Sequence, residues 1–397
     1  MFEEIKEIGS TGILPMAWLR KAANDDVIFT ERYKIPPGNF QPASLDLRLG
    51  EKAHRLRCSF LPDSSAVWDK LPDLQMEELD LRDGAILERN RPYLIPLIEE
   101  LRLPDFIRAK TNPKSSTGRL DIFTRVITDN SHRFDDVAAG YHGQLYLEVV
   151  SRSFTIRVKT GLSLNQLRLT KGDASCGEGE LLRRHGEKPI VLAEPGYTGD
   201  PRQPSLNNTI GLSANLAGRT GGVGYRARKN SNLLDLSREH HYDPGDYWEP
   251  VYAEHSRRLI LEPEEFYLLT SAEGVSIPPD FAAEMTAYDP SSGELRTHYA
   301  GFFDPGFGLG EIRAPGGVQP VMEVRAHDVP FMIEHGQNIC TITFEKMLEI
   351  PEKLYGADIG SSYQGQGLVL SKHFLAETNH WQMPLFEGQV GDAGVGG

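Results

Sequence analysis

The sequence predicts a mainly β protein that is built from two similar copies in tandem. Short runs such as residues 44–49 and 144–150 alternate apolar and polar side chains, and Gly, Pro, Asn or Asp bound them. A period of two is typical of strands that bury one face. The chain has 397 residues, more than the roughly 250 to 300 that one hydrophobic core ordinarily holds. We therefore expect two strand-rich domains with few short helices.

Several short motifs recur at a nearly constant offset. Pro-Asp-Phe at 104–106 returns at 279–281, and Leu-Glu-Val at 147–149 corresponds to Met-Glu-Val at 322–324, an offset of 175 in both cases. A proline, a serine and an arginine at 113, 115 and 119 correspond to those at 290, 292 and 296. Such a register indicates an internal repeat, which determines the architecture.

The repeat and the composition together set the expected domain limits. We expect a first domain at 1–170, a connector rich in Gly, Pro and charge at 171–206, a second domain at 207–350 and a C-terminal segment at 351–397 with a disordered end. Proline followed by helix-forming residues predicts a helix at 15–23, and a second one is expected near 329–335.

Composition excludes several classes of function. The chain has 56 acidic and 42 basic residues and a net charge of −14, which disfavours nucleic acid as a partner. No apolar run is long enough to cross a bilayer, and no secretory signal is visible, so we expect a cytoplasmic protein without a membrane role. The three cysteines are far apart, which argues against disulfides and against a thiolate metal site.

A polar turn at 112–119 is the first candidate for chemistry. Lys114, Ser115, Ser116 and Arg119 offer cations and hydroxyls of the kind that hold phosphate oxygens. An exposed polar turn would have the same composition, and the repeat favours the functional interpretation.

A glutamate within an apolar strand is the second candidate. A carboxylate at such a position is either paired or functional, unless strand alternation places Glu148 in solvent, and both interpretations stay open. His132, Arg133 and Asp135 precede it in a turn-rich stretch, where they form either a functional loop or an exposed ion pair. No HxE followed by PCxxC occurs, which disfavours a zinc deaminase, and we expect no metal site.

These segments resemble the dCTP deaminases, and the resemblance covers both copies. It rests on residues 41–50 (QPASLDLRLG), 113–119 (PKSSTGR), 131–135 (SHRFD), the Leu-Glu at 147–148, residues 300–307 (AGFFDPGF) and residues 363–367 (YQGQG) before Ser371 and Lys372. Lysine stands where the family has its first arginine, and about three residues are inserted before Gly140. The second copy lacks that arginine and carries an insertion at 308–319, so the first copy is the better match.

The resemblance implies a fold and an activity. The fold would be two tandem dUTPase-like domains, each a distorted β-barrel or jelly roll, and the reaction would convert dCTP to dUTP and ammonia. Glu148 would be the general base, with Ser115 and Arg119 orienting the water and the glutamate, so Glu148→Gln should abolish turnover. The implied substrate-binding residues are Lys114, Ser116, His132, Arg133, Asp135, Gln166, Tyr363, Gln366 and Lys372, the last three in a C-terminal lid, and the second-copy candidates are Ser292, Arg296, Asp304 and Glu323.

The resemblance also implies cofactors and assembly. We expect no catalytic cofactor, Mg²⁺ arriving with the nucleotide, and a homo-oligomer, with a trimer favoured. Three alternatives stay open: a bifunctional enzyme that also releases pyrophosphate and gives dUMP, a nucleotide-binding regulator that has lost activity, and a β-rich structural protein.

Overall fold

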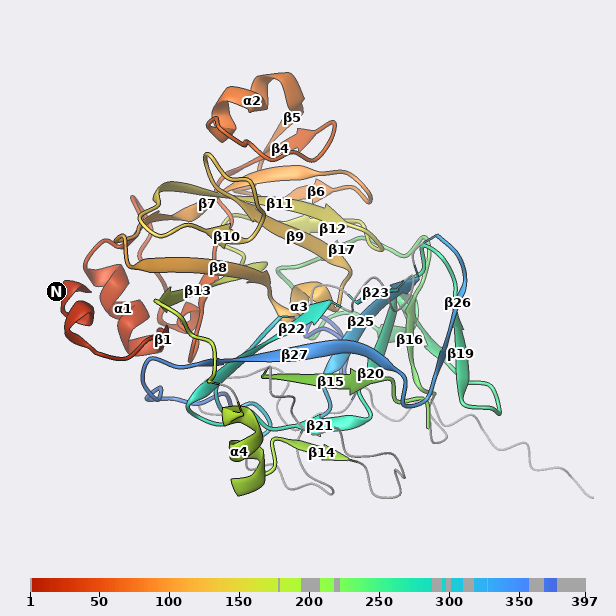
Figure 1. The fold of residues 1–397 in the computed structure, drawn as a ribbon. Coiled ribbons are helices and arrows are strands. Elements are labelled where there is room, and N and C mark those ends of the chain that lie inside the picture. The colour runs from red at the N-terminus through yellow and green to blue at the C-terminus, as the bar shows by residue number, and fades with distance from the viewer. Residues whose placement is uncertain are drawn as a thin grey trace, which may run out of the picture.

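A computed structural model describes residues 2–177, 179–193, 208–217, 222–287, 295–297, 301–309, 318–326, 328–356 and 368–376. Strands dominate these residues, which confirms the predicted mainly β fold with few short helices (Figure 1). The helices of the described residues are α1 (Met16–Asn24), α2 (Val67–Leu74), α3 (Ser115–Gly118) and α4 (Glu180–Glu187), with 3-10 turns at Phe2–Glu7, Pro37–Asn39 and Pro244–Asp246. No helix in this part of the chain is both long and apolar enough to span a membrane.

The strands of the first half form two main sheets. One sheet follows the order β5-β4-β7-β11-β9, and the other follows β1-β13-β8-β10. The strands are β1 (Gly12–Ile13), β2 (Ile28–Phe29), β3 (Leu45–Leu47), β4 (Lys52–Leu56), β5 (Gln75–Asp80), β6 (Ala85–Leu87), β7 (Tyr93–Arg102), β8 (Ile107–Pro113), β9 (Ile122–Ile127), β10 (Asp136–Val137), β11 (His142–Ser151), β12 (Ile156–Val158) and β13 (Asn165–Lys171).

The second half repeats this arrangement. Its sheets follow β18-β16-β20-β25-β23 and β15-β27-β22-β24. The strands are β14 (Val191–Ala193), β15 (Thr209–Ser213), β16 (Gly224–Ala227), β17 (Leu234–Asp235), β18 (Trp248–Val251), β19 (Arg258–Leu261), β20 (Tyr267–Thr270), β21 (Glu273–Val275), β22 (Phe281–Ala287), β23 (Leu295–Thr297), β24 (Phe302–Phe303), β25 (Val321–Ala326), β26 (Phe331–Glu334) and β27 (Asn338–Lys346).

Strand register supports the repeat residue by residue. Glu148 of β11 lies opposite Leu94 of β7, and Glu323 of β25 lies opposite Leu268 of β20. The β8–β13 pair corresponds in the same way to the β22–β27 pair. Both glutamates therefore occupy equivalent positions on a central strand, and this confirms the two tandem copies.

Buried apolar side chains form two large clusters that do not coincide with the two halves. The first cluster contains the interior of the first half together with Tyr225, Trp248 and Phe266 from the second half. The second cluster lies between the sheets of the second half and includes Leu212, Phe281 and Phe344. Because the second half supplies aromatic side chains to the first core, the two halves share a hydrophobic interface.

Charged contacts also join the halves. Arg325 of β25 forms a buried ion pair with Asp121, just before β9. Arg168 of β13 is fully buried and donates hydrogen bonds to the backbone oxygens of Ala283 and Phe303, at 2.9 and 2.8 Å. In Figure 1, α3 lies at this junction, close to β22 and β25.

Two expectations about secondary structure need correction. The helix expected near residues 329–335 is wrong, because β26 occupies this stretch and pairs with β19. The described residues of the expected connector, 171–177 and 179–193, contain secondary structure that its composition did not indicate, namely α4 and also β14, which pairs with β21. The helix expected at 15–23 is confirmed as α1.

Candidate active site

The α3 turn positions two of the predicted site residues. Strand β8 ends at Pro113, and the backbone then closes tightly, with the amide of Gly118 donating to the carbonyl of Lys114 at 3.0 Å and that of Arg119 donating to the carbonyl of Ser115 at 3.1 Å. Residues four apart on one turn share a face. Ser115 and Arg119 therefore point to the same side, toward the second half.

The group they meet is Glu323 of the second copy. Ser115, Arg119 and Glu323 line one hollow, whose volume among the described residues is about 50 Å³. A Cβ atom built on Gly118 would lie 2.5 Å from Oε1 of Glu323, so the turn approaches the carboxyl more closely than any other residue type would allow. This volume accommodates a water molecule beside the carboxyl.

The carboxyl of Glu323 lies in an unusual electrostatic environment. Its side chain is buried, and its Oε2 atom has no hydrogen-bond partner among the described residues. Burial raises the pKa of Glu323 well above its ordinary value of 4.5, the positive charge of Arg119 lowers the pKa, and the negative charge of Asp121 raises it. A carboxyl group with a raised pKa is suited to accept and return a proton near neutral pH.

A second carboxyl group lines the same hollow. Asp304 is buried and accepts a hydrogen bond from Nη2 of Arg168 at 3.3 Å. Burial raises the pKa of Asp304 to about 6, although the charge of Arg168 opposes this shift. The guanidinium of Arg168 also stacks on Phe302, 3.9 Å from the ring centre. The hollow thus contains two titratable carboxyls and the cation of Arg119.

Glu148 lies elsewhere. It is fully buried on β11, where its Oε1 accepts a hydrogen bond from Arg125 of β9 at 2.6 Å, so the alternative of a solvent-exposed glutamate is wrong. It lines a separate pocket with a volume of about 740 Å³. The predicted grouping of Glu148 with Ser115 and Arg119 is therefore not found within the chain. The reason is that β9 places Arg125 opposite Glu148, whereas α3 faces the second half.

Comparisons with known proteins decide the family. The model of the 2'-deoxycytidine 5'-triphosphate deaminase N-terminal domain matches residues 10–173, and the model of the C-terminal domain matches residues 178–374. The chain belongs to the dCTP deaminase family. A crystal structure of the 2'-deoxycytidine 5'-triphosphate deaminase from Agrobacterium tumefaciens aligns with a TM-score of 0.79 and 46% identity, covering 86% of this chain and 99% of that one.

Sequence relatives match over a shorter length. The dCTP deaminase of Natronomonas pharaonis is 32% identical over 143 residues, which is 35% of this chain and 67% of that protein. A dUMP-forming dCTP deaminase of Methanosphaera stadtmanae is 34% identical over 129 residues, which is 31% of this chain and 60% of that protein. This dCTP deaminase family member thus spans less than two thirds of the Methanosphaera relative.

Some predicted substrate-binding residues of this family member lie near the hollow. The hydroxyl of Ser371 donates to the backbone oxygen of Ser116 at 2.8 Å, and Arg119 donates to the backbone oxygen of Val369, so the stretch 368–376 packs against α3. Gln166 is buried beside the same turn and donates to the backbone oxygen of Pro113 at 3.3 Å.

Other predicted residues are engaged away from it. Lys114 forms an ion pair with Asp46, and Lys372 forms one with Glu239 at 2.5 Å. His132 pairs with Asp63, and Arg133 lies 3.9 Å from Asp136. The side chain of His132 is 73% exposed and that of Arg133 is 82% exposed. The structure therefore does not bring these four residues to the hollow.

Asp135 holds neighbouring strands together. Its carboxyl accepts hydrogen bonds from the amide of Val126 at 2.8 Å and from the hydroxyl of Thr111 at 2.7 Å, and burial raises its pKa to about 6. These bonds tie the loop before β10 to β8 and β9.

Three predicted residues cannot be placed. Tyr363, Gln366 and Ser292 lie outside the described residues, and only the backbone of Arg296, in β23, is described. In the part of the chain that is described, no group of three or more His, Cys, Asp or Glu side chains is arranged to hold a metal ion.

Sequence reasoning missed two features of the site. It named Ser115, Arg119 and Glu323 but placed Glu323 in a different site from the other two, whereas all three line one hollow. It also passed over Gly118 and Arg168, although a glycine inside the polar turn was a visible sign of a close approach.

Proposed function

We propose that this chain deaminates dCTP to dUTP and ammonia at the hollow lined by Ser115, Arg119 and Glu323. The observation that carries the proposal is the buried carboxyl of Glu323, which lines the hollow together with Ser115 and Arg119. Its pKa is raised, and its Oε2 has no hydrogen-bond partner among the described residues. Family membership supports the same substrate.

The residues divide the chemistry as follows. Glu323 removes a proton from a water molecule while the water oxygen adds to C4 of the cytosine ring, and it returns this proton to N3 of the ring. The carboxylate then takes the proton of the new C4 hydroxyl and passes it to the amino group, so the C4–N bond breaks, the C4 carbonyl forms, and ammonia leaves a uracil ring. Positioned acid–base groups of this kind contribute roughly 10²–10⁴ in rate. Ser115 orients the water, and Arg119 keeps part of the carboxyl population ionised.

The reaction as proposed needs no catalytic metal. Proton transfer through one carboxyl is sufficient for hydrolysis of the C4–N bond of this cyclic amidine, and Mg²⁺ enters as the complex with the triphosphate. We place the enzyme in the cytoplasm, in agreement with its free, widely spaced cysteines. We further propose a homotrimer, in which each chain supplies both halves of its own site.

A second candidate function is release of pyrophosphate from dUTP, which gives dUMP. Asp304 favours it, because this buried carboxyl with a pKa of about 6 lines the same hollow and could activate a second water. Relatives such as the Methanosphaera protein carry the description dUMP-forming.

Product analysis tests the proposal. The purified chain, treated with a chelator and then supplied with Mg²⁺ alone, is incubated separately with dCTP, dUTP and CTP, and the nucleotides are separated by chromatography. We expect dUTP from dCTP, and dUMP in addition if Asp304 supports the second reaction. Unchanged dCTP would contradict the proposed function, and activity that returns only with a transition metal would contradict the metal-free mechanism.

A further inference from the structure

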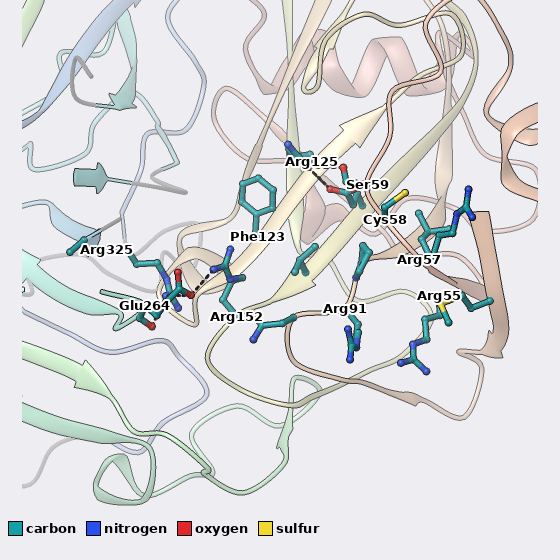
Figure 2. A pocket seen from close by; sticks show the side chains of 17 residues that line it. Arg55, Arg57, Cys58, Ser59, Arg91, Phe123, Arg125, Arg152, Glu264 and Arg325 are labelled. Carbon is teal, nitrogen blue, oxygen red and sulfur yellow. Dashed lines mark hydrogen bonds and ion pairs between the residues drawn. The ribbon is translucent and has the colours of Figure 1, made fainter. Parts of the chain in front are cut away.

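A second, larger pocket lies apart from the hollow of Glu323. Its volume is about 740 Å³, within the range of small-molecule sites. The end of β4, the turn before β7 and strands β9 and β11 form most of its wall, and Glu264 and Arg325 of the second half complete it (Figure 2). Ser115, Arg119 and Glu323 are not among its lining residues.

Arginine is the dominant residue of this pocket, in a chain whose net charge is −14. Only two carboxylates, Glu148 and Glu264, line it among the described residues. Figure 2 shows the guanidinium groups distributed from one end of the pocket to the other. The arginines that line it are Arg55, Arg57, Arg91, Arg125, Arg152 and Arg325.

Carboxylates neutralise only part of this charge. Four of the six lining arginines are paired: Arg55 with Glu88 at 3.2 Å, Arg125 with Glu148, Arg152 with Glu264 at 3.2 Å, and Arg325 with Asp121. Arg57 and Arg91 are exposed and have no carboxylate within ion-pair distance among the described residues. The pocket therefore has a positive excess that a bound anion would neutralise.

One lining arginine, Arg125, is held in place before any ligand binds. The guanidinium of Arg125 lies 3.7 Å from the ring centre of Phe134 and 4.5 Å from that of Phe123, and its Nη2 donates to the hydroxyl of Ser59 at 2.9 Å. Its Nη2 also donates to Oε1 of Glu148 at 2.6 Å, while Oε2 of Glu148 is buried without a hydrogen-bond partner among the described residues. Such preorganisation lowers the entropy lost on binding.

We propose that this pocket binds a small oligophosphate, either free or as a nucleotide, at a site separate from the deamination site. Guanidinium groups bind phosphate oxygens in bidentate geometry, and several arginines spaced along one pocket suit a chain of phosphates better than a single anion. Apolar side chains, among them Met76, Pro92 and Phe123, line the same pocket and could contact a nucleotide base.

Calorimetric titration of the full chain with tripolyphosphate tests this proposal. We expect a binding site that is lost, or weakened by at least about tenfold, in the double variant Arg57→Ala/Arg91→Ala, because charge-assisted hydrogen bonds disappear. The variant should keep its KM and kcat for dCTP. The matched control, Arg32→Ala/Arg183→Ala, removes two exposed arginines outside the pocket and should bind tripolyphosphate like the unmodified chain.

Further titrations distinguish the possible ligands. Tighter binding of ATP than of tripolyphosphate supports a nucleotide site, and equal binding supports a site for the phosphate chain alone. The proposal is overturned if the unmodified chain binds neither, if the Arg57→Ala/Arg91→Ala variant binds both normally, or if its KM for dCTP rises in parallel. Preference for a single-stranded oligonucleotide over both ligands would also overturn it. Because turnover is measured separately, failure here leaves the proposed deaminase activity intact.

Discussion

Glu323 and Arg119 come from opposite halves of the sequence and line one hollow. Burial and the neighbouring guanidinium act on the carboxyl in opposite directions, and burial is the larger effect on its pKa. The outcome is a carboxyl that binds a proton more readily than an exposed glutamate does, which is what a group that both accepts and returns a proton requires.

The dependence of activity on pH follows from this environment. Turnover requires the ionised form of Glu323, so kcat/KM should fall with decreasing pH at a point well above 4.5. Arg119→Gln should lower the rate and also move this fall to higher pH, since the charge that lowers the pKa is gone. The matched variant Arg125→Gln, beside Glu148, should not move it. A fall at or below pH 4.5 would contradict the account.

Asp135 predicts a dependence of stability on pH. Its folded-state pKa of about 6 exceeds the ordinary value of 3.8. Between pH 3.8 and pH 6 the carboxyl of Asp135 is therefore mostly protonated in the folded state and mostly ionised in the unfolded state. The stability contributed by this proton is present below about pH 3.8 and is lost as pH rises to about 6. In urea unfolding, Asp135→Asn should therefore gain about 1–3 kcal/mol relative to the unmodified chain on going from pH 4 to pH 7. An equal difference at both pH values would contradict this assignment.

At the scale of elements, the α3 turn is the part of the fold that joins the two copies at the site. It follows β8 directly, and its backbone at Gly118 lies so close to the carboxyl of Glu323 that no Cβ atom fits between them. The geometry of Glu323 therefore depends on the absence of a side chain at residue 118.

Gly118→Ala should consequently impair catalysis more than folding. The added methyl group would lie 2.5 Å from Oε1 of Glu323 and must displace it. We expect kcat to fall at least about tenfold from misplacement of the carboxyl, with a loss of about 1–3 kcal/mol in unfolding free energy from overpacking. Gly38→Ala is the control, because nothing lies within 4 Å of a Cβ there. Normal kcat in Gly118→Ala would contradict the role of Glu323 as the acid–base group of the reaction.

Helices and strands were predictable where the sequence carried a clear local signal for one type of element. Alternation revealed β11, and proline followed by helix formers revealed α1. The stretch that contains β26 was misjudged because its apolar residues, Phe331, Met332 and Ile333, are consecutive, so no alternation of apolar and polar residues was evident. Helix α4 was hidden by the surrounding glycines and charges, since it buries only Leu181 among its described side chains.

At the scale of the whole molecule, the packing of one copy against the other creates the site. The sequence identified the serine, the arginine and both glutamates from the repeat, but a repeat does not tell which copy faces which. That choice is made by contacts between the halves, such as the buried ion pair of Arg325 with Asp121 and the bonds of Arg168 to the second half. Individual residues of these contacts carry no pattern in the sequence.

A site contained within one chain predicts the outcome of a mixing experiment. Chains carrying Ser115→Ala/Arg119→Ala are unfolded and refolded together with chains carrying Glu323→Gln, and dCTP turnover is measured. We expect no recovery, because every chain in the mixture then has a defective site. Turnover well above that of either variant alone would mean that the site forms between chains.

The most direct test of the account compares two glutamates at equivalent positions of the repeat. Steady-state turnover of dCTP is measured for Glu323→Gln and Glu148→Gln after both variants are shown to be folded. We predict that Glu323→Gln lowers kcat by about 10²–10⁴. Glu148→Gln should keep kcat within about tenfold of the unmodified chain, since Glu148 pairs with Arg125 outside the hollow. Loss of turnover in Glu148→Gln with normal turnover in Glu323→Gln would contradict this prediction.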